Sequence, residues 1–428
     1  MQKSLTLKPI RYIDGELNVP GSKSISNRVL LLSALSTGNT ILKNLLYSDD
    51  VNYMLNALSQ LGVSFSLNKS KSTCEIKGIS GPLFSEKKIT LFLGNAGTAM
   101  RPLLAILSLK KNKIILTGDD RMKERPICHL VNSLKQGGAN ISYLNKQEFP
   151  PVYIKGGFSG GEITVNGTIS SQFLSSLLIA SPLAQLNTKI VVEGNLVSKP
   201  YIDLTINLMR KFGIVVDVLN NYKYFYIQGN QNYISPKEYF IESDFSSATY
   251  FLAAAAIKGG SVKINGMQKN SIQGDTDFVN VLKKMGASII WNKNSLICTK
   301  KNLFGITIDC NHIPDAAMTI AMLGLFSNQF VHIKNIYNWR VKETDRLYAM
   351  STELKKIGAN VQEGTDFIII HPVKKFLHAT INTYNDHRIA MCFSLVALSG
   401  VSITLLNPGC VNKTFPLFFK KFYSICHY

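Results

Sequence analysis

The chain has 428 residues, of which 46% are hydrophobic and 17% charged, and its formal net charge is +20. This length predicts two domains, and the hydrophobic fraction is ordinary for a globular protein. No apolar run approaches the roughly 18 residues of a membrane span, no signal-peptide pattern is present, and the cysteines lack metal-ligand spacing. We therefore expect a cytoplasmic protein, whose positive charge indicates either an anionic partner or a lysine-rich composition.

The first predicted elements follow a loop at 20–23 and alternate between helix and strand. Apolar residues fill one side of the segment that begins at Ser24, and Asp49 and Asp50 favour a second helix because helix N-termini carry partial positive charge. In chain order we predict a helix at 24–36, a strand at 40–44, a helix at 49–61, and strands at 63–67 and 74–77. This succession forms one unit of two helices and about four strands, and it returns along the chain.

The second helix of each unit ends in a glycine at a nearly fixed interval. The glycines are Gly62, Gly138, Gly213, Gly286 and Gly358. They lie 76, 75, 73 and 72 residues apart (138−62, 213−138, 286−213 and 358−286). Glycine adopts the left-handed conformation that ends a helix at little cost, so each predicts a helix C-terminus. A degraded sixth copy at 419–423 carries tyrosine instead, and the regular spacing predicts a fold of six repeats.

Polar residues open the first helix of each unit. We expect these helices to begin at Ser24, Gly97, Ser171, Ser246, Asp315 and Asp386. Any one of these residues, taken alone, is explained as a helix N-cap. Six together predict anion binding, because helix N-termini offer unpaired N–H groups and partial positive charge. We expect two sets of three, one per domain, to face each other across a cleft.

Five charged or glycine-rich segments carry the residues of greatest chemical interest. They are Pro20–Arg28, Leu93–Pro102, Asp120–Pro126, Asn338–Arg346 and Tyr384–Met391. The first combines two cations with three hydroxyls and suits a phosphate or carboxylate, although it lacks P-loop spacing. The fourth sets Lys342 and Arg346 four residues apart, which predicts that both lie on one face of a helix.

Taken together, these segments closely resemble the enolpyruvyl transferases, and within them the 5-enolpyruvylshikimate-3-phosphate synthases, in order and spacing along nearly the whole chain. The resemblance implies an α/β fold of two domains, an inside-out α/β barrel in which each domain holds three βαβαββ units with parallel helices. It implies an upper domain at 21–240 and a lower domain that combines 1–20 with 241–428.

The resemblance also implies an activity, the transfer of the enolpyruvyl group of phosphoenolpyruvate to the 5-hydroxyl of shikimate 3-phosphate with release of phosphate. This step belongs to aromatic amino acid biosynthesis. Both substrates carry a phosphate and a carboxylate, which accounts for a basic site without nucleic acid. The implied enzyme is a monomer with no metal, flavin, nicotinamide, nucleic-acid or membrane partner. Gly97, Thr98 and Pro102 match the pattern of relatives in which glyphosate competes with phosphoenolpyruvate.

The resemblance assigns site roles residue by residue. Shikimate 3-phosphate would contact Lys23, Ser24, Arg28, Ser170, Ser171, Gln172, Ser198, Tyr201, Asp315, Asn338 and Lys342. Phosphoenolpyruvate would contact Lys23, Asn95, Gly97, Arg125, Gln172, Arg346, His387, Arg388 and Lys413. The reaction needs a base for the hydroxyl and an acid for the methylene carbon. The resemblance implies Asp315 as the base, with Glu343 and Lys23 as candidate proton donors.

Plainer interpretations of single residues stay open. Asp315 is also explained as a helix N-cap, and Glu343 as half of a surface ion pair with Lys342. Trp339 is expected to serve packing, and Cys128 is expected to be buried rather than reactive.

Two alternative functions also stay open. The sister transferase that acts on UDP-N-acetylglucosamine carries a reactive cysteine five residues before the Arg-Pro pair, where this chain has Asp120. A basic repeat protein that binds RNA would show aromatic strand motifs, and this chain lacks an RNP-type motif. Both alternatives are therefore less favoured than the shikimate 3-phosphate reaction.

Overall fold

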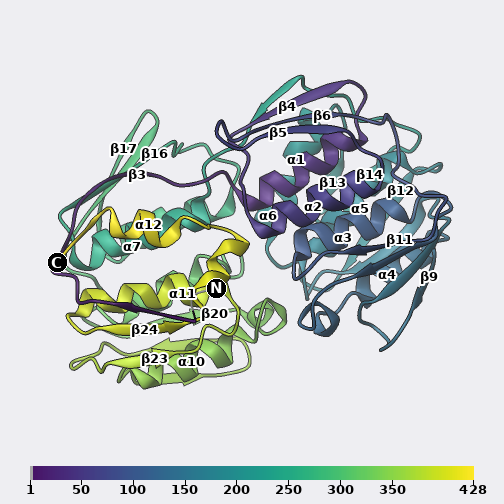
Figure 1. Cartoon of the computed structure of the whole chain (residues 1–428). Coiled ribbons are helices and arrows are strands. Elements are labelled where there is room, and N and C mark those ends of the chain that lie inside the picture. Colours follow the sequence, from purple (N-terminus) through teal and green to yellow (C-terminus); the bar gives the residue numbers. More distant parts are fainter. Residues whose placement is uncertain (1–2) are drawn as a thin grey trace. The chain divides into compact units, whose positions relative to one another are not determined.

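The computed structural model describes residues 3–428, which form two compact units (Figure 1). One unit consists of Gly21–Ile241, and the other joins the N-terminal segment up to Pro20 to Glu242–Tyr428. They are named the 21–241 unit and the 242–428 unit. The chain therefore passes between the units twice, once after Pro20 and once after Ile241.

The 21–241 unit alternates helices and strands in the predicted order. Its helices are α1 (Lys23–Leu35), α2 (Asp49–Gln60), α3 (Gly97–Leu107), α4 (Cys128–Gln136), α5 (Ser171–Ala180) and α6 (Lys199–Lys211). Its strands are β4 (Asn39–Lys43), β5 (Phe65–Asn68), β6 (Thr73–Lys77), β7 (Ile89–Phe92), β8 (Ile114–Thr117), β9 (Asn140–Tyr143), β10 (Val152–Gly156), β11 (Gly161–Asn166), β12 (Thr188–Glu193), β13 (Asp217–Leu219), β14 (Tyr224–Ile227) and β15 (Glu238–Phe240).

The 242–428 unit repeats the arrangement. Its helices are α7 (Phe245–Lys258), α8 (Phe278–Lys284), α9 (Ala317–Gly324), α10 (Arg346–Lys356), α11 (His387–Ser394) and α12 (Phe418–Tyr423). Its strands are β1 (Ser4–Leu7), β2 (Tyr12–Ile13), β3 (Gly15–Asn18), β16 (Ser261–Asn265), β17 (Ser288–Asn292), β18 (Ser295–Thr299), β19 (Thr307–Asp309), β20 (Val331–Lys334), β21 (Val361–Glu363), β22 (Ile368–Ile370), β23 (Ala379–Ile381), β24 (Ile403–Leu406) and β25 (Cys426–His427).

Each large sheet repeats one strand order, in which the first two strands run parallel and the other neighbours antiparallel. In one sheet, β7 is parallel to β8, β8 is antiparallel to β10, and β10 is antiparallel to β9. The orders are β15-β4-β6-β5, β7-β8-β10-β9 and β11-β12-β14-β13 in the 21–241 unit, and β3-β16-β18-β17, β19-β20-β22-β21 and β23-β24-β1 in the 242–428 unit. The predicted βαβαββ repeat is confirmed, while each sheet remains open rather than closing into a barrel within residues 3–428.

Three sheets take one strand from a distant part of the chain. Strand β15 pairs with β4, so that Glu238 lies opposite Ile41. Strand β3 pairs with β16, and β1 pairs with β24, where Ser4 lies opposite Leu406. The N-terminal segment is thus an integral part of two large sheets in the 242–428 unit, and its strand β2 also pairs with β25 in a two-stranded sheet.

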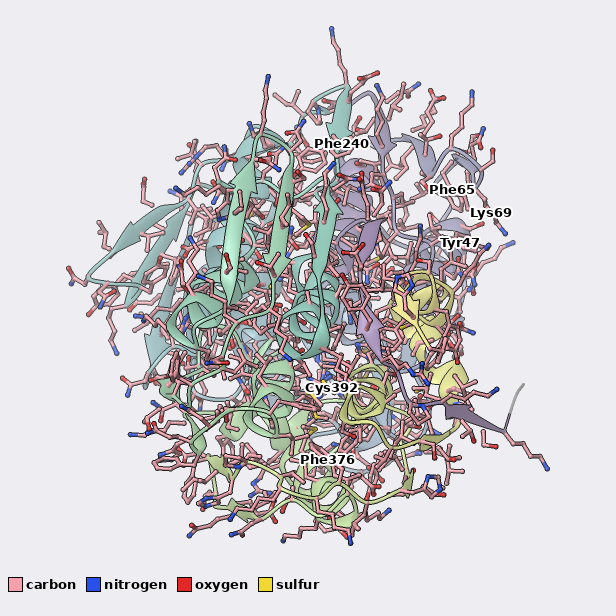
Figure 2. All side chains as sticks on the ribbon, turned by 90° about the vertical axis from the view of Figure 1, so that its left-hand side faces the viewer. Tyr47, Phe65, Lys69, Phe240, Phe376 and Cys392 are labelled. Atoms are coloured by element: carbon pink, nitrogen blue, oxygen red, sulfur yellow. The ribbon has the colours of Figure 1, made fainter. Side chains whose placement is uncertain are left out.

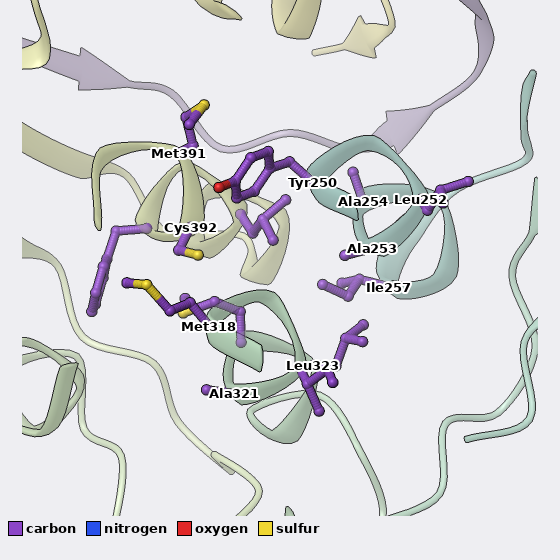
Figure 3. Packing of buried hydrophobic residues seen from close by; sticks show 14 of the residues in the cluster. Tyr250, Leu252, Ala253, Ala254, Ile257, Met318, Ala321, Leu323, Met391 and Cys392 are labelled. Atoms are coloured by element: carbon purple, nitrogen blue, oxygen red, sulfur yellow. The ribbon is translucent and has the colours of Figure 1, made fainter. Parts of the chain in front are cut away.

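The first helix of each repeat is buried on nearly every side. All residues of α9 and α11 are buried, as are most of α7. Figure 3 shows Tyr250 and Ala253 of α7, Met318 and Ala321 of α9, and Cys392 of α11 within this core. Such helices have no polar face to expose, so their polar residues gather at the N-termini. The second helices, such as α2 and α4, bury only an apolar stripe.

The predicted glycine caps are confirmed. Gly62, Gly138, Gly213, Gly286 and Gly358 all have φ between 83° and 97°. The degraded sixth copy ends differently, because Ser424 after α12 has φ −68°.

Some predicted helix starts were displaced by one or two residues. Helix α7 begins at Phe245 with Asp244 as its cap, since the Asp244 carboxylate accepts a hydrogen bond from the Ser247 N–H, and Ser246 lies inside the first turn. Helix α9 has Ala316 as its N-cap residue, so Asp315 stands just outside the helix.

Surface lysines lie against aromatic rings at several places. The Lys69 ammonium is 4.4 Å from the centre of the Tyr47 ring, a pair labelled in Figure 2, and that of Lys110 is 4.7 Å from the Phe84 ring. Part of the net positive charge is therefore spread over exposed side chains. Within residues 3–428, no helix is long and apolar enough to cross a membrane.

Candidate active site

The starts of α1, α3 and α5 meet in the 21–241 unit. The Asn27 amide in α1 donates a hydrogen bond of 2.6 Å to the Thr98 hydroxyl in α3. A Cβ atom added to Gly97 at the start of α3 would lie 3.1 Å from Oε1 of Gln172 in α5. Three helix N-termini with their partial positive charge therefore share one place, as the repeat pattern predicted for each domain.

Arg28 is a buried cation in this group. Its Nε donates to the Thr205 hydroxyl at 2.8 Å, its Nη1 to the Ser24 carbonyl at 2.9 Å, and its Nη2 lies 3.5 Å from the Ser175 hydroxyl. Within the described residues, no carboxylate forms an ion pair with it. Burial lowers the pKa of Arg28 to about 10. A cation desolvated among neutral partners is stabilised by an anion, so this position suits a negatively charged ligand.

Gly97 gives two arginines room to approach the start of α3. Its hypothetical Cβ would lie 2.5 Å from Nη1 of Arg101 and 3.0 Å from Nη2 of Arg125. Arg125 is buried, and its Nη1 donates to the Asn95 side-chain oxygen at 2.8 Å and to the Asn95 carbonyl at 3.2 Å. A side chain at position 97 would occupy the space that these guanidinium groups and Gln172 surround.

The remaining predicted residues of this unit lie at α1, α5 and α6. The Lys23 ammonium, at the start of α1, is 3.3 Å from the Asp50 carboxylate in the first turn of α2. Ser170 caps α5, because its hydroxyl accepts a hydrogen bond of 3.2 Å from the Gln172 N–H, and Ser171 is buried beside it. Ser198, with φ 55°, is the N-cap residue of α6. Tyr201 lies on α6, close enough to act electrostatically on Arg28.

Asp315 is the centre of the second cluster, in the 242–428 unit. Its Oδ1 lies 3.0 Å from Nη1 of Arg346 and 3.8 Å from the Lys342 ammonium, and its Oδ2 lies 2.9 Å from Nη2 of Arg388. Burial by itself would raise the pKa of Asp315, but Arg388, Lys342 and Arg346 hold it well below its usual range. The carboxylate is therefore ionised at neutral pH.

Arg346 joins three carboxylates. Besides Asp315, it contacts Glu343 through Nη2 at 2.9 Å and Asp386 through Nε at 2.8 Å. Glu343 is buried and pairs with Arg346, so the interpretation as a surface pair with Lys342 was wrong. Arg388 adds a contact to α7, since its Nη1 donates to the Tyr250 hydroxyl at 3.1 Å.

The prediction that Lys342 and Arg346 lie on one face of a helix was wrong. Lys342 follows the 3₁₀ helix η4 (Tyr337–Val341), whereas Arg346 is the first residue of α10, with Asp345 as its cap. The two cations meet at Asp315 because the chain turns between them. The N-cap interpretation of Asp315 was wrong as well, since Ala316 is the N-cap residue of α9.

Neighbouring buried residues fix the loop that carries Asp315. The Trp339 indole, which is fully buried in η4, donates to the Pro314 carbonyl at 2.7 Å. Asn338 is buried beside it. The prediction of a packing role for Trp339 is confirmed, with the addition of this hydrogen bond.

Two further predicted residues lie near α11. His387 is buried at its start, with Nδ1 3.5 Å from Oδ1 of Asp386. Lys413 is buried at the end of the 3₁₀ helix η6 (Pro408–Lys413), which packs against α11. Cys128 is buried on α4, and burial raises the pKa of its thiol, as expected for an unreactive cysteine.

Three residues of these clusters were not predicted from the sequence. Arg101 lies one turn after Gly97 on α3, and that spacing was the available signal. Asp386 was expected only as a helix start, yet it also binds Arg346. Asp275 is buried near Asp315 and accepts a hydrogen bond from the Ser246 hydroxyl. Nothing in the local sequence distinguished Asp275 from an ordinary turn residue.

Comparison with known families gives a match along nearly the whole chain. The model of EPSP synthase (3-phosphoshikimate 1-carboxyvinyltransferase) matches residues 7–422. The chain belongs to the EPSP synthase family. Both clusters lie within the matched region.

Relatives in the EPSP synthase family are similar over their full length. A 3-phosphoshikimate 1-carboxyvinyltransferase of Buchnera aphidicola subsp. Cinara cedri is 74% identical over 428 residues, which cover 100% of this chain and 98% of the relative. The protein of the same name from Erwinia tasmaniensis is 57% identical over 427 residues and 100% of both chains.

Solved structures agree with the fold. An EPSP synthase from Acinetobacter baumannii superposes with a TM-score of 0.83 at 26% identity, over 99% of this chain and 98% of that one. The enolpyruvyl transferase NikO from Streptomyces tendae has a TM-score of 0.78 at 12% identity, over 99% and 98% of the two chains, and supports the fold alone.

Proposed function

We propose that the chain transfers the enolpyruvyl group of phosphoenolpyruvate to the 5-hydroxyl of shikimate 3-phosphate and releases phosphate. Family membership supports this activity, and the relatives that match full length are named for it. The observation that best supports the proposed chemistry is that the Asp315 carboxylate is ionised and lies among three cations. The 21–241 unit corresponds to the upper and the 242–428 unit to the lower domain of the family.

Residues at positions that match the family's motifs are assigned to each substrate. For shikimate 3-phosphate these are Lys23, Ser24, Arg28, Ser170, Ser171, Gln172, Ser198, Tyr201, Asp315, Asn338 and Lys342. For phosphoenolpyruvate these are Lys23, Asn95, Gly97, Arg125, Gln172, Arg346, His387, Arg388 and Lys413. Arg28 supports the first assignment, because its described contacts are all with neutral groups and an anion would complete them. The space at Gly97 beside Arg101 and Arg125 supports the second.

The proposed reaction is an addition followed by an elimination. The 5-hydroxyl oxygen bonds to C2 of phosphoenolpyruvate while its proton leaves and C3 gains a proton, which gives a tetrahedral ketal phosphate. The bond from C2 to the phosphate oxygen then breaks, and a proton leaves the methyl group to restore the double bond. Asp315 accepts the hydroxyl proton, and Glu343 or Lys23 exchanges the proton at the methyl carbon. The cations around Asp315 and Glu343 stabilise the negative charge of the departing phosphate.

A direct assay tests this proposal against the sister activity. The purified chain, with phosphoenolpyruvate and shikimate 3-phosphate, is expected to release phosphate only when both substrates are present. Replacing shikimate 3-phosphate with UDP-N-acetylglucosamine is expected to abolish release. Release with the sugar nucleotide, or none with the proposed pair, would overturn the assignment. We further propose that the active form is a monomer and that it lies in the cytoplasm. Gel filtration tests the first proposal, and cell fractionation tests the second.

A further inference from the structure

Glu353 is a buried carboxylate that the proposed reaction does not use. It lies in the last turns of α10 with 0% of its surface exposed. Its Oε2 accepts a hydrogen bond of 3.1 Å from the Asn382 N–H, and its Oε1 accepts one of 2.8 Å from the Tyr384 hydroxyl. Lys356, with a side chain that is 41% exposed, donates to both oxygens at 2.9 and 2.7 Å. The carboxylate therefore joins α10 to the loop after β23, which lies beside it in Figure 1.

The segment that Glu353 holds has an unusual backbone. Tyr384 and Asn385 are consecutive non-glycine residues with φ of 50° and 53°. Single residues in this left-handed region cost about 1 kcal/mol or more and persist where neighbouring groups hold them. Here the Tyr384 N–H donates to the Asn382 side chain at 2.9 Å, and the Asn407 amide donates to that of Asn385 at 3.1 Å. Hydrogen bonds to Glu353 are thus part of what maintains this turn.

The turn leads directly into the candidate site. Asp386 follows Asn385, caps α11 by accepting from the Arg388 N–H at 2.9 Å, and binds Arg346. Arg346 and Glu353 are both on α10, seven residues apart, which is about two helical turns and places them on one side of the helix. Helix α10 consequently contacts the segment 382–388 at two points, one at Asp386 and one at Asn382 and Tyr384.

We infer that Glu353 is a positioning residue, which holds the turn at 382–385 through Tyr384 and thereby sets the orientation of Asp386, Arg346 and Arg388. Burial, and then the hydrogen bond to Glu353, raise the pKa of the Tyr384 phenol, so it remains a donor. This role rests on the proposed function, because it acts on residues assigned to phosphoenolpyruvate. Loss of the contact should therefore change the KM for phosphoenolpyruvate more than the KM for shikimate 3-phosphate.

Two variants remove the contact without removing the side chains. Tyr384→Phe deletes the hydroxyl but keeps the ring, which packs edge-on against Tyr348 of α10 with centroids 6.5 Å apart. Glu353→Gln keeps the size but offers one acceptor oxygen where three donor groups arrive, the Asn382 N–H, the Tyr384 hydroxyl and the Lys356 ammonium. Each is expected to raise the KM for phosphoenolpyruvate about tenfold while that for shikimate 3-phosphate changes less than about twofold. The double variant is expected to resemble Glu353→Gln alone, because both changes break the same contact.

Lys356→Gln is the matched control. It removes a partner of the same carboxylate on the solvent side but leaves the contacts with Asn382 and Tyr384 in place. We expect a lower melting temperature and unchanged KM values. If Tyr384→Phe and Glu353→Gln also lower the melting temperature without moving the KM for phosphoenolpyruvate, Glu353 is only structural and the inference fails. If the wild-type chain itself releases no phosphate from the two substrates, the proposed function fails instead.

Discussion

Arg346 and Asp386 form a buried ion pair with two contacts. Nε lies 2.8 Å from Oδ2 and Nη2 lies 3.3 Å from Oδ1, and the side chains are 1% and 0% exposed. The residues are 40 positions apart and belong to α10 and to the cap of α11. The pair thus connects the starts of two helices that both supply residues to the Asp315 cluster.

Asp386→Asn is expected to destabilise the protein and impair the site together. The variant keeps an oxygen for the α11 cap but leaves Arg346 buried with one carboxylate fewer, which costs about 3 kcal/mol of unfolding free energy. Urea unfolding measures the loss, and the KM for phosphoenolpyruvate should rise. Glu238→Gln, which breaks the exposed pair of Glu238 with Lys43, is the control and should cost less than about 1 kcal/mol. Equal effects of the two variants would contradict this prediction.

Arg28→Met should weaken the binding of shikimate 3-phosphate without lowering the stability of the protein. The substitution removes a buried charge whose described contacts are neutral, so the melting temperature should stay the same or rise. The KM for shikimate 3-phosphate should increase about 100-fold, equivalent to about 3 kcal/mol, through loss of a charge-assisted contact. Arg210→Met, at the exposed end of α6, is a control for charge removal. A large loss of melting temperature with an unchanged KM would show that Arg28 is structural.

Lys342→Met should shift the pH dependence of turnover. Lys342 is one of three cations that lower the pKa of Asp315, so its removal moves that pKa upward. Asp315 then becomes protonated at a higher pH than in the wild type, so the acid limb of the kcat profile should move toward higher pH. The measurement is made at saturating shikimate 3-phosphate, because Lys342 is also assigned to that substrate. An acid limb that does not move would contradict the proposal that Asp315 is the base.

Asp275→Asn should stabilise the protein most at alkaline pH. Burial first, and then the charge of Asp315, raise the pKa of Asp275 to about 7. The folded state therefore keeps a proton that the unfolded state releases near pH 4, and wild-type stability falls as the pH rises from about 4 to 7. Asparagine does not titrate, so the advantage of the variant should grow by about 2 kcal/mol between pH 5 and pH 8. Urea unfolding at both values tests this, and a constant difference would exclude the titration.

The periodic features of the fold were predictable from the sequence, because they depend on local physics repeated six times. Gly62 and its counterparts ended helices as expected, since only glycine adopts the left-handed cap cheaply. Contacts between distant segments were not predictable. The pairing of Arg346 with Asp386 depends on how α10 packs beside the loop before α11, and no single sequence shows that approach.

The error at Lys342 and Arg346 has a physical cause. The side chain of Asp345 accepts a hydrogen bond of 3.1 Å from the Tyr348 N–H and starts α10 at the next residue. Four-residue spacing suggested one helix, but the capping residue between the two cations was the stronger signal. Lys413, which was assigned by resemblance, lies outside the five charged or glycine-rich segments and had no local signal.

The pairing of β1 with the distant strand β24 affects the order in which the sheets can form during synthesis at the ribosome. Residues 21–241 include every strand of their own three sheets, so this part has all its partners once Phe240 of β15 has emerged. By contrast, β1 pairs with β24, which is translated about 400 residues later. At about 5–20 residues per second, Ser4 waits tens of seconds for Leu406. Strand β1 is thus translated long before β24 can pair with it, and until then its unpaired edge is open to chaperones.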